Sequence, residues 1–145
     1  MIGVVLVTHG NVGESLLDAA AWIAGESLEF VVNVPMNPEH SPDDQAGRIA
    51  HAVRSFNEGA VILTDLFGGT PQNLALTLLD DGRVDVVSGV NLPMLLGISA
   101  ARAQSKDAHE LALMLQRRAQ NAIVVAGDTL RRHAEASREL PAVNS

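Results

Sequence analysis

Residues 2–10 read Ile-Gly-Val-Val-Leu-Val-Thr-His-Gly, a nearly continuous apolar run that ends in a histidine and a glycine. An apolar run of this kind, without polar alternation, is typical of a strand that is covered on both faces of a sheet. Residues 12–24 follow as an amphipathic helix, and Gly25 is placed to end it. The segment therefore predicts a strand that passes directly into a helix, with His9 at the junction.

The same alternation continues along the chain. Further strands are predicted at 28–34, 60–65, 84–88 and 122–126, and helices at about 42–56, at 71–79, after Asn91 and at 107–119. This pattern predicts a doubly wound α/β fold with a mainly parallel sheet and helices on both faces. Right-handed crossovers that place the third strand beside the first give the strand order 2-1-3-4.

Two polar side chains meet at one edge of this predicted sheet. His9 follows the first strand and Asp65 ends the third, so both lie at the carboxyl ends of neighbouring strands, where such sheets bind ligands. If Asp65 accepts a hydrogen bond from Nδ1–H of His9, it fixes the tautomer and leaves Nε2 free to attack phosphorus. The pair predicts a histidine nucleophile with an orienting carboxylate.

Groups that suit an attached phosphoryl group lie nearby in the sequence. The helix starts after Gly10 and at Thr70 offer exposed N–H groups, which favour an anion. Gly68 and Gly69 allow a close backbone approach, and the Thr70 hydroxyl can donate to a phosphoryl oxygen. We therefore expect these four residues to bind the phosphoryl group.

Composition excludes several classes of protein. The 145 residues fit one domain and contain no cysteine, which rules out disulfides and thiolate catalysis. The net charge of -7 argues against nucleic-acid binding. No apolar run is long enough to cross a membrane, and the first strand lacks the basic flank of a signal peptide, so a cytoplasmic protein is expected. No cofactor or metal is expected, because the histidines other than His9 lack the spacing of a helical zinc site.

Three segments resemble a known family. Residues 7–10 (Val-Thr-His-Gly), 65–73 (Asp-Leu-Phe-Gly-Gly-Thr-Pro-Gln-Asn) and 89–95 (Gly-Val-Asn-Leu-Pro-Met-Leu) are similar to the signature segments of the mannose-type EIIA domain of the phosphoenolpyruvate:sugar phosphotransferase system (PTS). The resemblance implies that the phosphohistidine carrier HPr, or a paralogue, phosphorylates His9 at Nε2. It also implies that an EIIB protein receives the group and that Asp65 orients the histidine.

The resemblance extends to the fold and the assembly. It implies a homodimer whose fifth, antiparallel strand is exchanged between subunits, which suits residues 122–126. Residues 1–126 are then the EIIA-like phosphocarrier domain. Residues 127–145 form a polar C-terminal tail without a counterpart in the family, and no fused EIIB domain is expected.

Other functions fit the sequence less well. Residues 10–15 superficially resemble a nucleotide phosphate loop, but Glu14 stands where the loop requires lysine. A receiver domain phosphorylated on Asp65 would need further acids after the first strand and a lysine after the last one. The EIIA-like subunit of dihydroxyacetone kinase is disfavoured by residues 68–73. A regulatory module, whose phosphorylation state signals PTS activity to a non-transport partner, stays open as the alternative.

Overall fold

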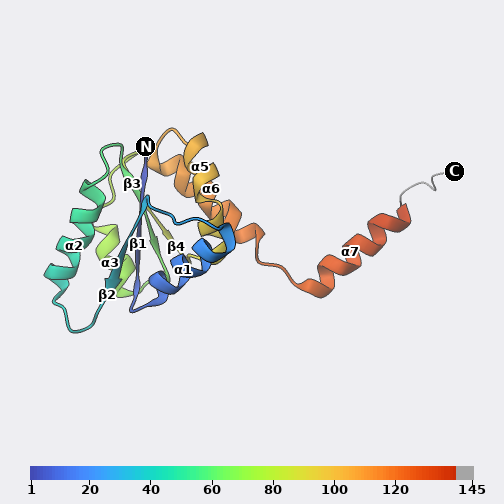
Figure 1. Ribbon diagram of the computed structural model, residues 1–145, viewed down its shortest axis with the longest axis horizontal. Coiled ribbons are helices and arrows are strands. Elements are labelled where there is room, and N and C mark those ends of the chain that lie inside the picture. The colour runs from blue at the N-terminus through green and yellow to red at the C-terminus, as the bar shows by residue number, and fades with distance from the viewer. Residues whose placement is uncertain (140–145) are drawn as a thin grey trace.

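A four-stranded, fully parallel sheet forms the centre of the molecule (Figure 1). The structure is a computed structural model, and it describes residues 1–139. The strand order is β2-β1-β3-β4, as predicted. The strands are β1 (Gly3–His9), β2 (Val31–Met36), β3 (Ala60–Thr64) and β4 (Val84–Ser88).

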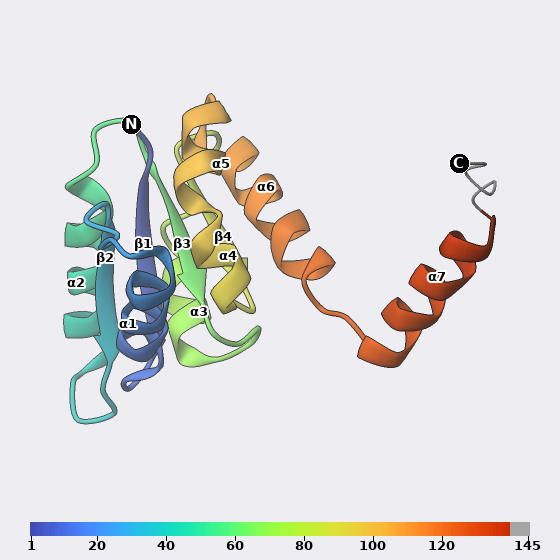
Figure 2. The same ribbon diagram turned by 45° about the vertical axis from the view of Figure 1, so that its right-hand side comes forward.

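Helices cover both faces of the sheet, which confirms the doubly wound α/β fold. One face carries α2 and α3, and the other carries α1, α4, α5 and α6, as Figure 2 shows. The helices are α1 (Val12–Ala24), α2 (Pro42–Arg54), α3 (Thr70–Leu76), α4 (Leu92–Leu96), α5 (Ile98–Gln104), α6 (Ala108–Asn121) and α7 (Ala126–Glu139). No helix within residues 1–139 combines the length and the apolar character that a membrane crossing requires.

The two central strands are buried on both faces, as their apolar sequences predict. Val4 and Leu6 of β1 pack under α1 and α6, whereas Val5 and Val7 pack under α2. Alternate residues of β3 divide between the two sides in the same way. The strand that carries His9 is therefore held rigidly along its length, and its carboxyl end lies at the surface.

Predicted helix starts agree with the structure at two positions. The Ser41 side chain accepts a hydrogen bond from Asp44 N–H at 3.1 Å, and Pro42 is the first helical residue of α2. The Asn91 side chain accepts from Met94 N–H at 3.0 Å at the start of α4. Side-chain caps are local, so sequence alone was sufficient to find them.

The second strand lies later in the chain than predicted. It spans residues 31–36 rather than 28–34, with Val31 opposite Val4 and Met36 opposite His9. Proline is rare within central strands, because it has no N–H to donate. However, β2 is an edge strand, and the carbonyl of Met36 faces β1, so the nitrogen of Pro35 points away from the sheet, where no N–H is needed.

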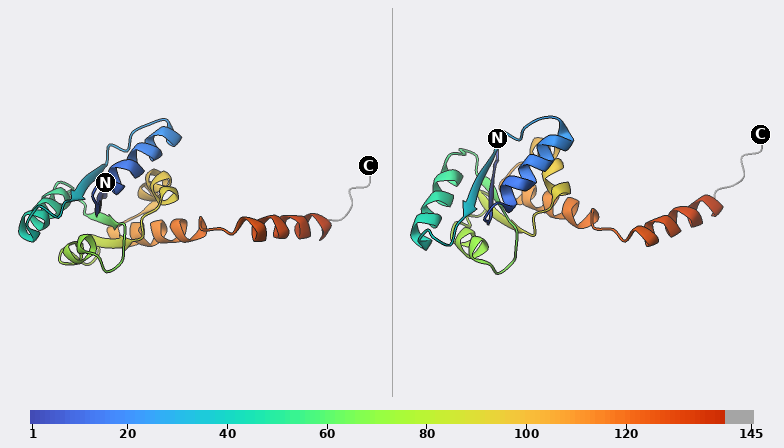
Figure 3. Two further views of the ribbon diagram at one scale, coloured as in Figure 1. Left: turned by 90° about the horizontal axis from the view of Figure 1, so that it is seen from below. Right: turned by 60° about the horizontal axis from the view of Figure 1, so that its bottom comes forward.

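The C-terminal region differs from the prediction. Residues 122–125 belong to no strand of this chain, and α7, which the sequence analysis treated as a polar tail, follows them. Figure 3 shows α7 extending away from the sheet in both of its views, and no residue of α7 is buried. An exchanged strand requires a second chain, so it stays a prediction. Residues 140–145 of the predicted tail lie outside the described part.

Candidate functional site

His9 and Asp65 lie in direct contact at the carboxyl edge of the sheet. His9 is the last residue of β1, and Asp65 directly follows β3, the neighbouring strand. The Nδ1 atom of His9 lies 2.9 Å from Asp65 Oδ2 and 3.1 Å from Oδ1. The backbone N–H of His9 also donates to Asp65 Oδ2 at 2.9 Å. Two donors from one residue therefore fix the carboxylate and the imidazole relative to each other.

The carboxylate of Asp65 is held in its ionised form. Burial by itself would raise the pKa of Asp65, but hydrogen bonds from the backbone and the side chain of His9 outweigh it, and the pKa is lowered below its ordinary value. Asp65 is 15% exposed in its side chain, whereas the imidazole of His9 is 51% exposed. An ionised acceptor at Nδ1 favours the tautomer in which Nε2 carries the lone pair.

Gly69 lies against the edge of the imidazole that bears Nε2. A Cβ atom at this position would lie 3.1 Å from His9 Cε1 and 3.6 Å from His9 Nε2. Gly69 is also the N-cap residue of α3, and Thr70 is the first helical residue. Thr70 is therefore part of the helix rather than its cap, and the Gly69 cap has no side-chain hydrogen bond.

Two of the predicted phosphoryl-binding glycines have occupied amides. Gly10 N–H donates to Met36 O at 3.0 Å, and Gly68 N–H donates to Gln72 Oε1. Both glycines have positive φ, 48° and 84°, so they shape the two loops beside His9. Within residues 1–139, the amides of Gly69 and Thr70 have no protein acceptor in a loop or cap.

Two side chains that sequence reasoning missed hold the site together. Thr8 is fully buried, and its hydroxyl accepts from Gly13 N–H at 2.7 Å, which ties the start of α1 to the strand that carries His9. Gln72 is 4% exposed and binds Gly68. A glutamine at the third position of a helix is a known capping signal, so Gln72 was detectable from sequence. Nothing local marks Thr8.

A second histidine–aspartate pair lies away from this site. His109 Nδ1 is 2.6 Å from Asp85 Oδ2, and this hydrogen bond, with weaker contributions from nearby acids, raises the pKa of His109. Asp85 belongs to β4 and His109 to α6. Among residues 1–139, no group of three or more His, Cys, Asp or Glu side chains is arranged to hold a metal ion.

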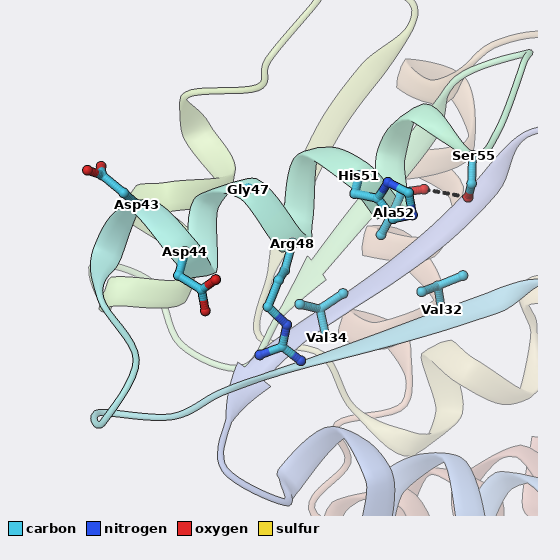
Figure 4. A pocket seen from close by; sticks show the side chains of 9 residues that line it. All are labelled: Val32, Val34, Asp43, Asp44, Gly47, Arg48, His51, Ala52 and Ser55. Atoms are coloured by element: carbon cyan, nitrogen blue, oxygen red, sulfur yellow. Dashed lines mark hydrogen bonds between the residues drawn. The ribbon is translucent and has the colours of Figure 1, made fainter.

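Two hollows lie on opposite edges of the sheet. One lies between β2 and α2, where Val32 and Val34 form an apolar floor beside Arg48 and His51 (Figure 4). It contains none of the predicted site residues. The other follows the outer edge of β4 and α6, and Phe67 and Gln72 reach it from the His9 side.

Comparison with known proteins places this geometry in a family. The sequence model of the EIIA-man family, described as PTS system fructose IIA component, matches residues 3–116. The chain belongs to the EIIA-man family. EIIA components take part in sugar phosphotransfer together with other PTS components, and this EIIA domain shares that activity.

Individual relatives and solved structures agree with the assignment of this EIIA domain. It is 31% identical over 105 residues to the PTS system fructose-specific EIIA component of Bacillus subtilis (strain 168), which covers 70% of this chain and 71% of that protein. It is 32% identical over 114 residues to the PTS system mannose-specific EIIAB component of Escherichia coli (strain K12), covering 76% of this chain but 35% of that longer protein. The crystal structure of EIIA from Streptococcus agalactiae superposes with a TM-score of 0.79 at 30% identity, covering 88% of this chain and 99% of that one.

Proposed function

We propose that His9 accepts a phosphoryl group on Nε2 from phospho-HPr or a paralogue and passes it to an EIIB-type protein in the cytoplasm. The observation that carries this proposal is the contact between His9 Nδ1 and the ionised Asp65 carboxylate at 2.9 Å, with the imidazole 51% exposed. The nitrogen next to Asp65 is occupied as a donor. The other nitrogen is the nucleophile, and it lies on a surface that a carrier protein can reach.

The transfer exchanges one nitrogen–phosphorus bond for another. The Nε2 lone pair of His9 forms a bond to phosphorus while the bond between phosphorus and the donor imidazole breaks, and the electron pair stays on the donor. The ring of His9, with a proton on Nδ1 and phosphorus on Nε2, becomes cationic, and Asp65 stabilises it through the existing hydrogen bond. Positioning and electrostatics are the main contributions of a protein to phosphoryl transfer.

The amides of Gly69 and Thr70 and the Thr70 hydroxyl are proposed as ligands of the phosphoryl oxygens. Gly69 lies beside the ring, since an added Cβ atom there would be 3.6 Å from Nε2, and Thr70 follows directly and is exposed. Gly10 and Gly68 contribute by shaping the loops, because their own amides are already bound within the protein. Of the four residues predicted to bind the phosphoryl group, the proposal therefore keeps Gly69 and Thr70 as hydrogen-bond donors.

A homodimer with an exchanged strand is the proposed assembly. Ile123, Val124 and Val125 are 77%, 65% and 69% exposed, which is a large apolar area for residues of strand-forming type. Among residues 1–139, no strand pairs with the outer edge of β4, and the backbone of Ser88 faces that edge. A hollow rich in apolar side chains runs along this edge. Residues 122–125 of a second copy suit the edge in chemistry and length.

Phosphorylation with a defined donor tests the proposal. Incubation with phosphoenolpyruvate, Enzyme I and HPr, followed by site mapping, is expected to label His9 alone. His9→Ala should abolish labelling while the circular dichroism spectrum is retained. His109→Ala is the matched control, since it removes the other histidine that pairs with an aspartate, and it should be labelled normally. Labelling of a residue other than His9 would overturn the proposal.

Asp65→Asn tests the part played by the carboxylate. Both 2.9 Å hydrogen bonds from His9 end on Asp65 Oδ2, and the second oxygen, Oδ1, lies 3.1 Å from Nδ1. In asparagine the amide NH2 therefore lies against Nδ1 in either orientation, and the ionised acceptor is lost, which favours the tautomer with the ring proton on Nε2. We expect transfer to slow by several orders of magnitude, as the loss of the correct tautomer costs ~10⁴-fold in a serine protease. A normal rate would remove Asp65 from the mechanism.

A further inference from the structure

The loop between β3 and α3 is held at its far end by one buried side chain. Gln72 is 4% exposed, and its Oε1 accepts a hydrogen bond from Gly68 N–H. Gly68 directly precedes Gly69, where an added Cβ atom would lie 3.1 Å from His9 Cε1 and 3.6 Å from Nε2. We propose that Gln72 is a positioning residue for phosphoryl transfer: it fixes the turn at Gly68 and thereby sets Gly69 beside Nε2 of His9. This inference rests on the proposed function of His9.

The contact with His9 explains why the capping group has to come from Gln72. Gly69 is the N-cap residue of α3, a position where a serine, threonine or aspartate side chain ordinarily binds the first turn. Any side chain at Gly69 would begin with a Cβ atom 3.1 Å from His9 Cε1, so the ordinary cap conflicts with the imidazole. A glutamine at the third helical position can instead reach back over the start of the helix. In this chain it reaches Gly68.

Besides Gln72, a backbone hydrogen bond holds the loop, because Asn73 N–H donates to Gly69 O at 3.0 Å. Leu66 and Phe67 are 57% and 81% exposed, so their side chains do not anchor the loop in the core. Gly68 has φ of 84°, a conformation that glycine enters and leaves freely. Asp65 fixes the beginning of the loop through His9, and Gln72 fixes its end. The Asn73 bond fixes the carbonyl of Gly69, and the Gln72 bond fixes the residue before it, so the direction of the Gly69 amide beside Nε2 depends on both.

Gln45 is a control for the alternative that Gln72 only stabilises the fold. Gln45 is 5% exposed, and its Oε1 accepts from Asn37 N–H at 3.1 Å while its Nε2 donates to His40 O at 3.1 Å. It fixes the loop between β2 and α2 as Gln72 fixes the loop between β3 and α3. The two glutamines match in burial and chemistry, and only Gln72 holds the loop that contacts the imidazole.

The test compares Gln72→Met, Gln72→Glu and Gln45→Met in the full-length chain. Methionine keeps a similar volume and removes the acceptor, whereas glutamate keeps an acceptor oxygen. Three quantities are measured: hydrogen exchange of the Gly68 amide by NMR, the chemical shift of the proton on His9 Cε1, and the rate of His9 phosphorylation at saturating phospho-HPr.

Gln72→Met is expected to lose protection of the Gly68 amide, to shift the His9 Cε1 proton and to slow transfer about tenfold, because a misplacement of ~1 Å near a reacting group can cost as much as 10²-fold. Gln72→Glu should restore the protection and most of the rate. Gln45→Met should leave all three quantities at their wild-type values. This contrast separates positioning from a general loss of stability.

Three results would overturn the inference: unchanged Gly68 protection in Gln72→Met, a wild-type rate in that variant, or equal slowing by Gln45→Met. A wild-type protein that phospho-HPr does not label at His9 would contradict the proposed function instead. In that case the Gly68 exchange and the His9 Cε1 shift still report whether Gln72 sets the loop against the ring. The two failures are therefore distinguishable.

Discussion

A methyl group added at Gly69 is expected to slow phosphoryl transfer without unfolding the protein. Gly69 has φ of -83° and ψ of 169°, which alanine adopts freely, so the backbone does not resist the substitution. The new Cβ would lie 3.1 Å from His9 Cε1. Carbon atoms prefer separations of about 3.5–4.0 Å, so the ring or the loop has to move by roughly 0.4–0.9 Å.

A displacement of this size is small for stability and large for catalysis. A misplacement of about 1 Å costs up to ~10²-fold in rate, so Gly69→Ala should slow transfer by about tenfold or more. Alanine also restricts the unfolded chain, which contributes about 0.4–1 kcal/mol and offsets part of the crowding. We therefore expect the free energy of unfolding to stay within ~1 kcal/mol of the wild-type value.

Gly47→Ala is the matched control for this experiment. Gly47 lies in the middle of α2, and a Cβ there meets nothing within 4 Å. This variant should gain up to ~1 kcal/mol of stability through its helix propensity and should transfer at the wild-type rate. Rapid-quench measurement of ³²P transfer from phospho-HPr gives the rates, and urea unfolding followed by circular dichroism gives the stabilities. A folded Gly69→Ala protein with a wild-type rate would refute the reasoning.

Three further predictions concern packing and pH. Gly13→Ala should destabilise the fold by about 1–3 kcal/mol in urea unfolding, because the new Cβ would lie 2.5 Å from Asn33 Oδ1 in the interior. A free energy of unfolding within error of the wild-type value would contradict the close packing of α1. The pKa of Asp65 is lowered in the folded state, so the ionised carboxylate stabilises the fold at neutral pH. This contribution is lost as the pH falls below 3.8 through the folded-state pKa. The difference in unfolding free energy between the wild type and Asp65→Asn should therefore shrink in acid. The pKa of His109 is raised by Asp85, so its contribution to stability is present below pH 6.5 and is lost as the pH rises through the folded-state pKa. NMR titration of the wild type and of Asp85→Asn checks the direction, with His109→Gln used to identify the His109 resonance. A wild-type His109 pKa at or below 6.5 would exclude the shift.

The fold was predictable from the sequence because its main signals are local or periodic. The apolar runs at 2–7 and 60–64 identify strands that are buried on both faces, and the caps at Ser41 and Asn91 mark helix starts through contacts that span three residues. The alternation of the two element types then restricts the topology to few solutions. The bounds of β1, α1 and β4 agree closely with the prediction.

The departures occur where contacts between distant residues outweigh local preference. Pro35 belongs to β2 because pairing with β1 sets the register and leaves its nitrogen on the open edge. The N-cap of α3 is a glycine without a side-chain cap, and a larger residue there would crowd His9, sixty residues earlier in the chain. The helix α5 was not predicted, and it packs into the core through Ile98 and Ala101.

The sequence by itself determined the type of fold, the order of its strands and the convergence of His9 and Asp65, because a parallel sheet brings the carboxyl ends of neighbouring strands to one edge whatever the details of packing. Only the tertiary structure decided which nitrogen of His9 meets Asp65 and which backbone amides beside the imidazole have no protein acceptor. These features depend on distances of a few ångströms between residues remote in the chain, and no periodicity or local propensity encodes such distances.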